Sequence, residues 1–222
     1  MRFSKIFGIG LPRTGTTSLN IALNQLGLAS KHFPFELYSQ QDHASLKQYI
    51  GQYTGLLDAP IPYMYKELDS LYPGSGFILT TRPVEDWLRS MAWLLDEGRC
   101  IWEWSQEYDS YNEVFFGSST FKRELFENHY YSFHKEVSDY FQNRNDFLIL
   151  DLKKGYGYKE LCDFLEVPIL NSEYPKGNEA RKARHLQRLA YLTGQDGKSL
   201  GKLLRRLDHY LIRCEQEISK IF

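Results

Sequence analysis

The chain has 222 residues, of which 42% are hydrophobic and 25% charged, a composition typical of a globular protein rather than a disordered or fibrous one. Its formal net charge is −1, so the chain as a whole has no electrostatic attraction to nucleic acid or to an acidic membrane surface. No stretch approaches the roughly 20 apolar residues of a membrane span, and the apolar run over 6–11 is too short and too rich in glycine for a signal peptide.

Apolar runs and helical repeats alternate along the first half of the chain. The expected elements there are, in order, a strand over 5–10, a helix over 16–26 that ends at Gly27, a strand over 54–58, a helix over 62–71 and a strand over 76–81. The last of these is a continuous apolar run, which is typical of a strand covered on both faces of a sheet. Residues 28–53 carry no firm pattern, although 45–53 favours a helix.

The second half continues this alternation. A helix is predicted from Pro83 onward, because apolar residues follow it at positions i, i+3, i+4 and i+7. After an aromatic stretch over 93–116 come a predicted helix over 121–141, a strand over 146–151, a helix over 158–165, a loop over 172–178 and a basic, helical C-terminal part. Strands alternating with helices predict an α/β fold of the P-loop type, with three α/β/α layers around a mainly parallel sheet. Residues 1–222 are expected to form a single domain.

The segment between the first strand and the first helix, Gly-Leu-Pro-Arg-Thr-Gly-Thr-Thr-Ser at 10–18, is the strongest functional signal in the chain. Gly10, Gly15 and Thr17 follow the spacing G-x4-G-x-T. The N–H groups at the start of a helix have no partner within the helix, and the helix dipole adds partial positive charge there. Glycine lets the backbone approach an anion closely, and hydroxyls add hydrogen-bond donors. This segment, the phosphate loop, is therefore predicted to bind an anion.

The residue at position 16 bears on the chemistry. A nucleotide-hydrolysing P-loop has Lys there, whereas this chain has Thr16 and carries the only cation of the loop earlier, at Arg13. Phosphoryl transfer needs a metal to neutralise the transferring oxygens. Transfer of the less charged sulfuryl group can proceed with hydroxyl and backbone donors and one cation. A P-loop small-molecule kinase and a non-catalytic anion- or nucleotide-binding protein are the alternatives.

The run Pro-Arg-Thr-Gly-Thr-Thr-Ser-Leu at 12–19 resembles the 5′-phosphosulfate-binding loop of sulfotransferases that use 3′-phosphoadenosine-5′-phosphosulfate (PAPS). The resemblance implies that PAPS is the sulfuryl donor and that no metal takes part. It also implies that the donor is bound by Arg13, Thr14, Gly15, Thr16, Thr17 and Ser18. Arg13 stands where these enzymes usually have Lys, and as a catalytic residue it would stabilise charge on the leaving phosphate.

A second segment resembles the 3′-phosphate site of the same family. Its pattern is a strand that ends in Arg, followed by a helix with Ser eight residues later, as at Arg82 and Ser90. Independently of the resemblance, an Arg at the carboxyl end of a parallel strand faces the crevice in which open α/β sheets bind ligands. Lys176, in Tyr-Pro-Lys-Gly-Asn at 174–178, lies where sulfotransferases often close a loop over the nucleotide, although a plain surface turn also explains it.

Two residues are candidates for the general base that takes the proton of the acceptor. Asp58 ends the strand over 54–58, so its carboxylate should open on the same crevice as the phosphate loop. His32 follows the first helix and could reach the mouth of that site. Each also has a plain structural explanation, Asp58 as the cap of the Ala-Pro turn after it and His32 as the maker of a local hydrogen bond. The sequence leaves the choice between them open.

The acceptor is expected to be a small molecule or a carbohydrate that carries a hydroxyl or an amine. Aromatic residues make up 15% of the chain, and those over 93–116 lie where sulfotransferases bind their acceptors. Rings of this kind stack on sugars and phenols alike, so the identity of the acceptor stays open, as does the oligomeric state.

The cysteines and histidines predict no metal site. The three cysteines are widely spaced and expected to be reduced thiols, and the six histidines show no metal-ligand spacing. Asp151, at the end of the strand over 146–151, is placed like a Walker-B acid but is expected to be structural. The expected location is the cytoplasm, and neither nucleic acid nor a membrane is an expected partner.

Overall fold

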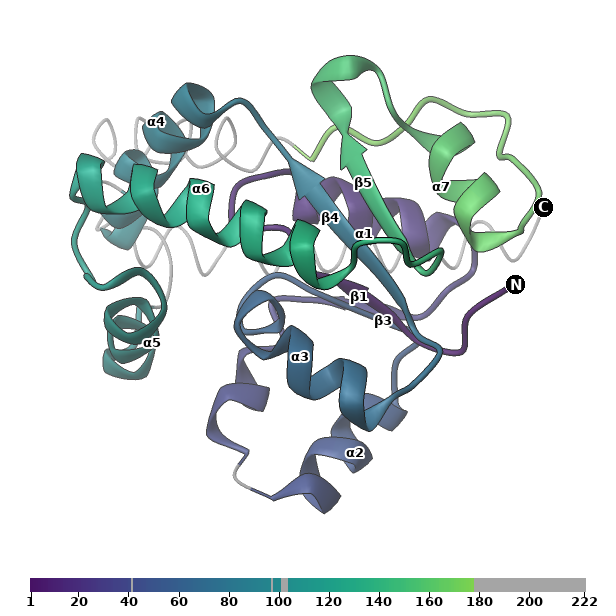
Figure 1. Ribbon diagram of the computed structural model, residues 1–222, viewed down its shortest axis with the longest axis horizontal. Coiled ribbons are helices and arrows are strands. Elements are labelled where there is room, and N and C mark those ends of the chain that lie inside the picture. Colours follow the sequence, from purple (N-terminus) through teal and green to yellow (C-terminus); the bar gives the residue numbers. More distant parts are fainter. Residues whose placement is uncertain (41, 97, 101–103, 178–222) are drawn as a thin grey trace, which may run out of the picture.

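The computed structural model describes residues 1–40, 42–96, 98–100 and 104–177 of the chain (Figure 1). The centre of this described part is a sheet of five parallel strands in the order β2-β3-β1-β4-β5. The strands are β1 (Ile6–Gly8), β2 (Ser30–His32), β3 (Gly55–Leu57), β4 (Gly76–Thr81) and β5 (Phe147–Asp151). An all-parallel sheet with helices on both faces confirms the predicted α/β fold.

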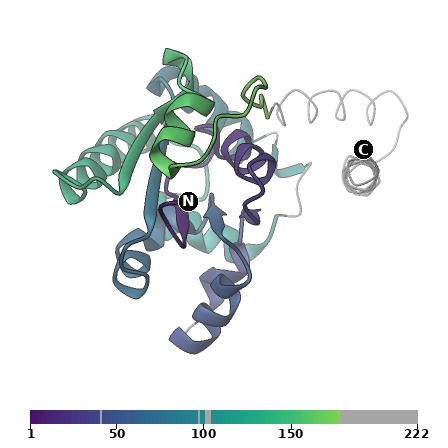
Figure 2. The ribbon, with the colours of Figure 1, turned by 90° about the vertical axis from the view of Figure 1, so that its right-hand side faces the viewer.

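Helices cover the two faces of the sheet. They are α1 (Thr16–Gln25), α2 (His43–Gly51), α3 (Ile61–Leu71), α4 (Val84–Leu95), α5 (Gln106–Phe116), α6 (Arg123–Tyr140) and α7 (Tyr158–Leu165), with short 3-10 turns η1 (Phe35–Ser39), η2 (Gly98–Cys100) and η3 (Leu152–Lys154). The side chains of α1 and α7 share one hydrophobic core, and those of α2 to α6 share the other. Figure 2 shows α1 and α6 on opposite sides of the sheet, as expected of three layers.

The apolar patterns in the sequence account for this core. Successive residues of a strand point to opposite faces, and accordingly Ile6 belongs to the core under α1 and α7 while Phe7 belongs to the other. On α4 the residues at helical spacing are buried, with Trp87 and Met91 both 0% exposed. Pro83 precedes α4, where its fixed φ and missing N–H suit a helix start.

Two elements of the structure were not predicted. β2 consists of Ser30, Lys31 and His32, three polar, half-buried residues at an edge of the sheet, so no apolar run marks it. α5 lies within the aromatic stretch, where rings at many positions obscure the helical repeat. The predicted helical C-terminal part lies outside the described residues, and the extent of the domain over 1–222 stays a prediction.

The strand order defines where a ligand can bind. The chain passes from β1 to the edge strand β2, returns through β3, and then crosses to β4 and β5 on the other side of β1. The carboxyl ends of β1 and β4 therefore border the topological switch point, the crevice in which open α/β sheets bind ligands. The phosphate loop follows β1, and Arg82 follows β4.

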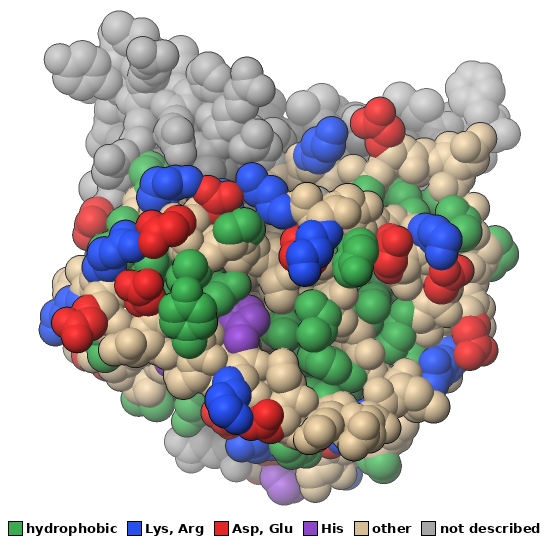
Figure 3. Space-filling view, turned by 45° about the horizontal axis from the view of Figure 1, so that its top comes forward, with side chains coloured by type: hydrophobic (Ala, Val, Ile, Leu, Met, Phe, Trp, Pro, Cys, Tyr) green, Lys and Arg blue, Asp and Glu red, His purple; other side chains and the backbone are tan. Residues whose placement is uncertain are grey.

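The surface of the described part gives two further observations. None of its helices is both long and apolar enough to cross a membrane. On the face seen in Figure 3, acidic and basic side chains are interspersed, without a broad region of one sign. Among the cysteines, Cys162 is a buried free thiol on α7, whereas Cys214 lies outside the described residues.

Candidate active site

The phosphate loop leads from β1 into the start of α1. Gly15 precedes the helix with a φ of 112°, a left-handed conformation that favours glycine. Among the described residues no side chain caps this helix end, and the first turn contains no acidic residue. The first N–H groups of α1 and the positive end of its dipole are therefore available to an anion.

Contacts with β4 and α4 hold the phosphate loop in place. The hydroxyl oxygen of Thr14 lies 2.7 Å from that of Thr80 on β4. A Cβ on Gly10 would lie 1.9 Å from the Thr80 hydroxyl, so only glycine fits there. The indole of the buried Trp87 donates to the carbonyl oxygen of Pro12 at 2.8 Å. The shape of the loop is thus determined by side chains that are distant in sequence.

Both candidate bases contact the phosphate loop. Thr16 donates its hydroxyl hydrogen to Oδ2 of Asp58 at 2.7 Å. Nε2 of His32 lies 2.9 Å from the same carboxylate oxygen, and 3.1 and 3.2 Å from the hydroxyls of Thr16 and Thr17. An anion site and two proton-accepting groups therefore meet at one point, which is the arrangement that a transferase needs and a simple anion-binding loop does not.

The plain structural explanation applies to Asp58 but not to His32. The N–H of Ala59 donates to Oδ1 of Asp58 at 2.7 Å, so Asp58 does cap the turn that follows it, in addition to contacting the loop. His32 is the last residue of β2 rather than a loop residue. Its contacts with Thr16 and Thr17 join it to another element, and they are not local.

Two opposing effects determine the pKa of Asp58. Burial disfavours the ionised carboxylate and by itself would raise the pKa. The positive charge that His32 carries when protonated, and hydrogen bonds from His32, Thr16 and the N–H of Ala59, favour the ionised form and hold the pKa of Asp58 below its ordinary value. Asp58 is thus an ionised and weakly basic carboxylate.

The residues predicted for the two phosphate subsites contact each other. Arg13 donates from Nε to the hydroxyl of Ser90 at 3.0 Å, and its guanidinium lies 5.4 Å from the centre of the Trp93 ring. Arg82 donates to the carbonyl oxygen of Arg13 at 3.2 Å. Tyr130 of α6 in turn donates its hydroxyl hydrogen to the carbonyl oxygen of Arg82 at 2.6 Å. These contacts join the loop after β1 and the end of β4 into one continuous polar region.

The segment before the C-terminal part lies on the start of α1. The N–H of Gly177 donates to the hydroxyl of Ser18 at 2.9 Å, and a Cβ on Gly177 would lie 3.0 Å from Cγ2 of Thr17. The segment is therefore more than an isolated surface turn, since it covers part of the phosphate loop. The side chain of Lys176 is exposed next to this contact, and Asn178 lies outside the described residues.

Strained backbone is concentrated at this site. Arg13, Phe33 and Asp58 have φ angles of 71°, 54° and 71°, in the left-handed region that residues with side chains rarely adopt. Such a conformation costs free energy and persists only where the surrounding structure imposes it. All three residues belong to the site or adjoin it.

Several residues that build the site were not identified from the sequence. Phe33 and Trp87 have their roles only through contacts between distant elements, as does Thr80. Tyr108 and Tyr111 lie within the aromatic stretch over 93–116, and nothing in the sequence distinguishes them from its other rings. Of these residues, only Phe33 had a signal in the sequence that could have identified it, because it directly follows His32, a candidate base.

Within the described part of the chain, no group of three His, Cys, Asp or Glu side chains could hold a metal ion. Asp151 ends the edge strand β5, which β4 separates from β1. Its carboxylate accepts the N–H groups of Lys153 and Lys154 at 3.0 and 3.3 Å and so shapes the turn after the strand.

The sequence matches the model of the sulfotransferase domain family over residues 5–183. The chain belongs to the sulfotransferase family. The match includes the phosphate loop, both candidate bases and the strand–helix segment with Arg82 and Ser90. As a member of this family, the chain is a transferase, and its general reaction is sulfuryl transfer.

The chain is similar to a curated protein and to a solved structure. Ava biosynthesis cluster protein M of Aspergillus versicolor is 25% identical over 214 residues, which covers 77% of this chain and 79% of that protein. The crystal structure of a sulfotransferase from Alicyclobacillus acidocaldarius is 16% identical and has a TM-score of 0.49, covering 86% of this chain and 96% of that one.

Proposed function

We propose that this member of the sulfotransferase family transfers the sulfuryl group of PAPS to a hydroxyl or an amine of an acceptor. The observation that carries the proposal is the 2.7 Å hydrogen bond between Thr16 and Asp58, because it joins the anion-binding loop directly to a proton acceptor. His32 reinforces the argument, since its Nε2 contacts both partners of that bond.

The residues present fit such a donor. The uncapped start of α1, from Gly15 to Ser18, would bind the 5′-phosphosulfate, and Thr14 would support it by holding the loop in shape through its hydrogen bond to the carbonyl oxygen of Leu11. Arg82 and Ser90 would hold the 3′-phosphate, and the exposed Lys176 would approach the nucleotide from the segment that covers α1. The link between Arg13 and Ser90 supports a single ligand that spans both subsites.

The transfer step follows from these positions. A lone pair of the acceptor oxygen or nitrogen forms the new S–O or S–N bond, while the bond between sulfur and the bridging phosphate oxygen breaks. The phosphate leaves with the electron pair, and Arg13 stabilises its charge. The acceptor proton passes to the pair of His32 and Asp58, whose Nε2 and Oδ2 atoms lie 2.9 Å apart. The products are a sulfate ester or sulfamate and adenosine 3′,5′-bisphosphate.

Calorimetry tests donor binding. We expect adenosine 3′,5′-bisphosphate to bind and ATP with Mg²⁺ to bind much more weakly. Arg82→Ala should lower the affinity by about 10- to 100-fold, since a charge-assisted hydrogen bond contributes about 1.5–3 kcal/mol. Arg89→Ala is the matched control, because this arginine of α4 is 71% exposed and paired with Asp86. Tighter binding of ATP with Mg²⁺ would favour a kinase instead.

Turnover with labelled PAPS and a panel of acceptors tests the catalytic part. Arg13→Ala should lower the rate by about 10²–10³, as removal of a single charge-stabilising donor commonly does. Asp58→Asn and His32→Gln should each lower the rate as well, because each variant removes one member of the proton-accepting pair. Near-normal turnover of Arg13→Ala would contradict the assignment, and nucleotide binding without any turnover would point to a non-catalytic binding protein.

A further inference from the structure

The residue after His32 is an exposed aromatic ring on a strained backbone. Phe33 has a φ of 54°, and its side chain remains 39% exposed. A bulky residue in the left-handed region costs free energy that Gly or Asn would avoid. The part of the side chain that stays exposed returns none of this through burial. A role in binding a ligand is therefore a better explanation of Phe33 than a role in the core.

The rings around Phe33 form a rigid corner. Phe33 is stacked on Phe35, with ring centres 5.3 Å apart and planes 8° from parallel. Tyr108 meets Phe33 edge-on at 5.4 Å and an angle of 83°, and it is stacked on Tyr111 at 5.8 Å. Of these four side chains, only Phe33 has a large exposed surface. The corner thus leaves one ring for a ligand to contact.

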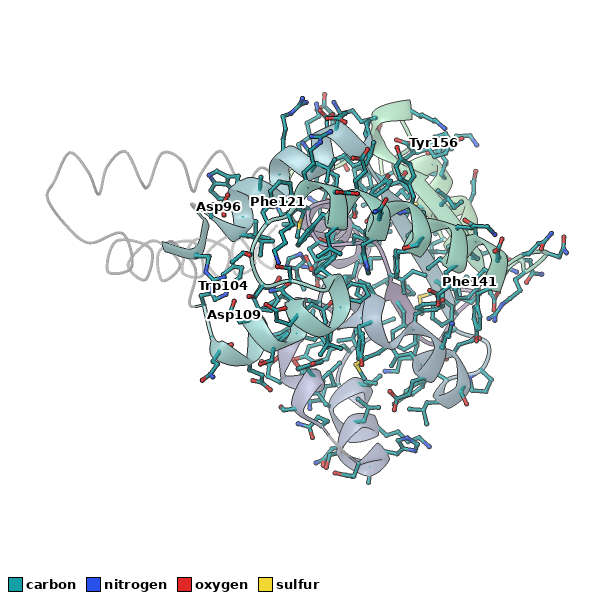
Figure 4. The ribbon with its side chains drawn as sticks, turned by 60° about the vertical axis from the view of Figure 1, so that its left-hand side comes forward. Asp96, Trp104, Asp109, Phe121, Phe141 and Tyr156 are labelled. Atoms are coloured by element: carbon teal, nitrogen blue, oxygen red, sulfur yellow. The ribbon has the colours of Figure 1, made fainter. Side chains whose placement is uncertain are left out.

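The helix that carries the tyrosines is held firmly at its start. Asp109 accepts a hydrogen bond from the indole of Trp104 at 2.7 Å and forms an ion pair with Arg99 at 2.7 Å. Figure 4 shows Trp104 and Asp109 close together at this end of α5. Trp104 also packs edge-on against Tyr108, with ring centres 4.8 Å apart. Tyr108 is therefore positioned before any ligand arrives.

The corner borders the reacting groups. His32 and Phe33 are consecutive, and the N–H of Phe33 donates to the carbonyl oxygen of Leu57, directly before Asp58, at 2.9 Å. Burial raises the pKa of the Tyr108 hydroxyl, and the charges of Asp58 and Arg13 both act on it as well. The ring corner and the phosphate loop therefore adjoin the same proton-accepting pair.

We propose that the acceptor is a phenol, a planar aromatic ring with a hydroxyl, whose ring lies on the exposed face of Phe33 beside Tyr108. This inference rests on the proposed function and names the acceptor class of that same site. Ring stacking would place the phenolic oxygen next to His32 and Asp58. The oxygen forms the S–O bond, its proton passes to that pair, and the phosphate leaves with the electron pair of the broken bond.

The weak basicity of the proton acceptor agrees with a phenol. Hydrogen bonds and the charge of His32 hold the pKa of Asp58 below its ordinary value. A phenol has a pKa of about 10, whereas an aliphatic hydroxyl is a far weaker acid, about as weak as water. A weak base removes the phenolic proton with a far smaller unfavourable free energy, so the site suits phenols better than alcohols or sugars.

A matched pair of acceptors tests the proposal on the full-length protein. 2-Naphthol and decahydro-2-naphthol share one carbon skeleton, but only the first is planar and acidic. We expect kcat/KM with PAPS to be at least about tenfold higher for 2-naphthol. Equal values, or a preference for the saturated alcohol or for a sugar, would overturn the proposal.

The variant Phe33→Gly separates the role of the ring from that of the fold. Gly adopts a positive φ without strain, so this change removes the ring and relieves the backbone together. KM for 2-naphthol should rise about tenfold while the affinity for adenosine 3′,5′-bisphosphate stays the same. Asn143→Gly is the control, since Asn143 has a φ of 63° and lies in the turn before β5, whereas the site lies beyond the carboxyl ends of the strands.

Different results would contradict the acceptor class and the proposed function. If Phe33→Gly leaves KM unchanged while the wild-type protein binds the nucleotide and sulfates acceptors, the inference about the acceptor is wrong and the proposed function stands. If the wild-type protein neither binds adenosine 3′,5′-bisphosphate nor uses PAPS, the proposed function fails and the acceptor class fails with it.

Discussion

Thr16→Val probes the contact that joins the phosphate loop to Asp58. Thr16 is 2% exposed, and its hydroxyl donates to a buried carboxylate at 2.7 Å. Valine has the same shape but no donor, so the variant loses one charge-assisted hydrogen bond. Such bonds contribute about 1.5–3 kcal/mol, and we expect a loss of that size in the free energy of unfolding, measured with urea at about pH 7.

The pH dependence of this loss distinguishes it from general damage to the loop. The pKa of Asp58 is lowered in the folded chain, so its stabilisation is present above the ordinary pKa of about 3.9 and is lost as the pH falls through the folded value. The cost of Thr16→Val should therefore be constant above about pH 5 and shrink as the pH falls below the ordinary pKa of about 3.9. Thr14→Val is the control, because the Thr14 hydroxyl donates to a neutral group, the carbonyl oxygen of Leu11, at 2.7 Å. A cost for Thr16→Val that is independent of pH, or below about 0.5 kcal/mol, would refute this reasoning.

Three other variants test how the site and its surroundings are built. Gly10→Ala places a Cβ 1.9 Å from the Thr80 hydroxyl, so we expect it to lower the free energy of unfolding by about 1–3 kcal/mol and to weaken the binding of adenosine 3′,5′-bisphosphate. Gly51→Ala is the control, because the space around Gly51 is open and the change should be neutral or stabilising. Trp87→Phe leaves a carbonyl oxygen of the phosphate loop without its donor and should cost about 2 kcal/mol in urea unfolding, and an unchanged midpoint would contradict the contact. Burial lowers the pKa of His129 to about 4. As the pH falls, His129 therefore becomes protonated in the unfolded chain before it does so in the folded chain. The free energy of unfolding should decrease as the pH drops from about 6.5 to 4. His129→Gln should flatten that part of the pH profile, and a profile as steep as that of the wild-type protein would show that other groups cause it.

Local patterns explain why most of the elements could be predicted. α7 occupies the predicted range, and β4 does so as well, because an apolar run or a helical repeat marks each of them over its whole length. β2 has no such pattern, since an edge strand of three half-buried residues needs no apolar side chains. The same holds for the site residues. Arg13 and Thr16 could be predicted because they lie in a contiguous motif, whereas Phe33 belongs to no motif and was not predicted.

The sequence by itself determined the α/β class, the anion-binding character of the phosphate loop and the two places where a base could lie. These properties depend on residues that are close together along the chain, where backbone preferences and side-chain spacing act. Only the tertiary structure decided that Thr16, His32 and Asp58 meet within hydrogen-bond distance, because they come from three elements whose neighbours are determined by the strand order β2-β3-β1. That order results from the packing of helices on both faces of the sheet, and no short stretch of sequence contains this information.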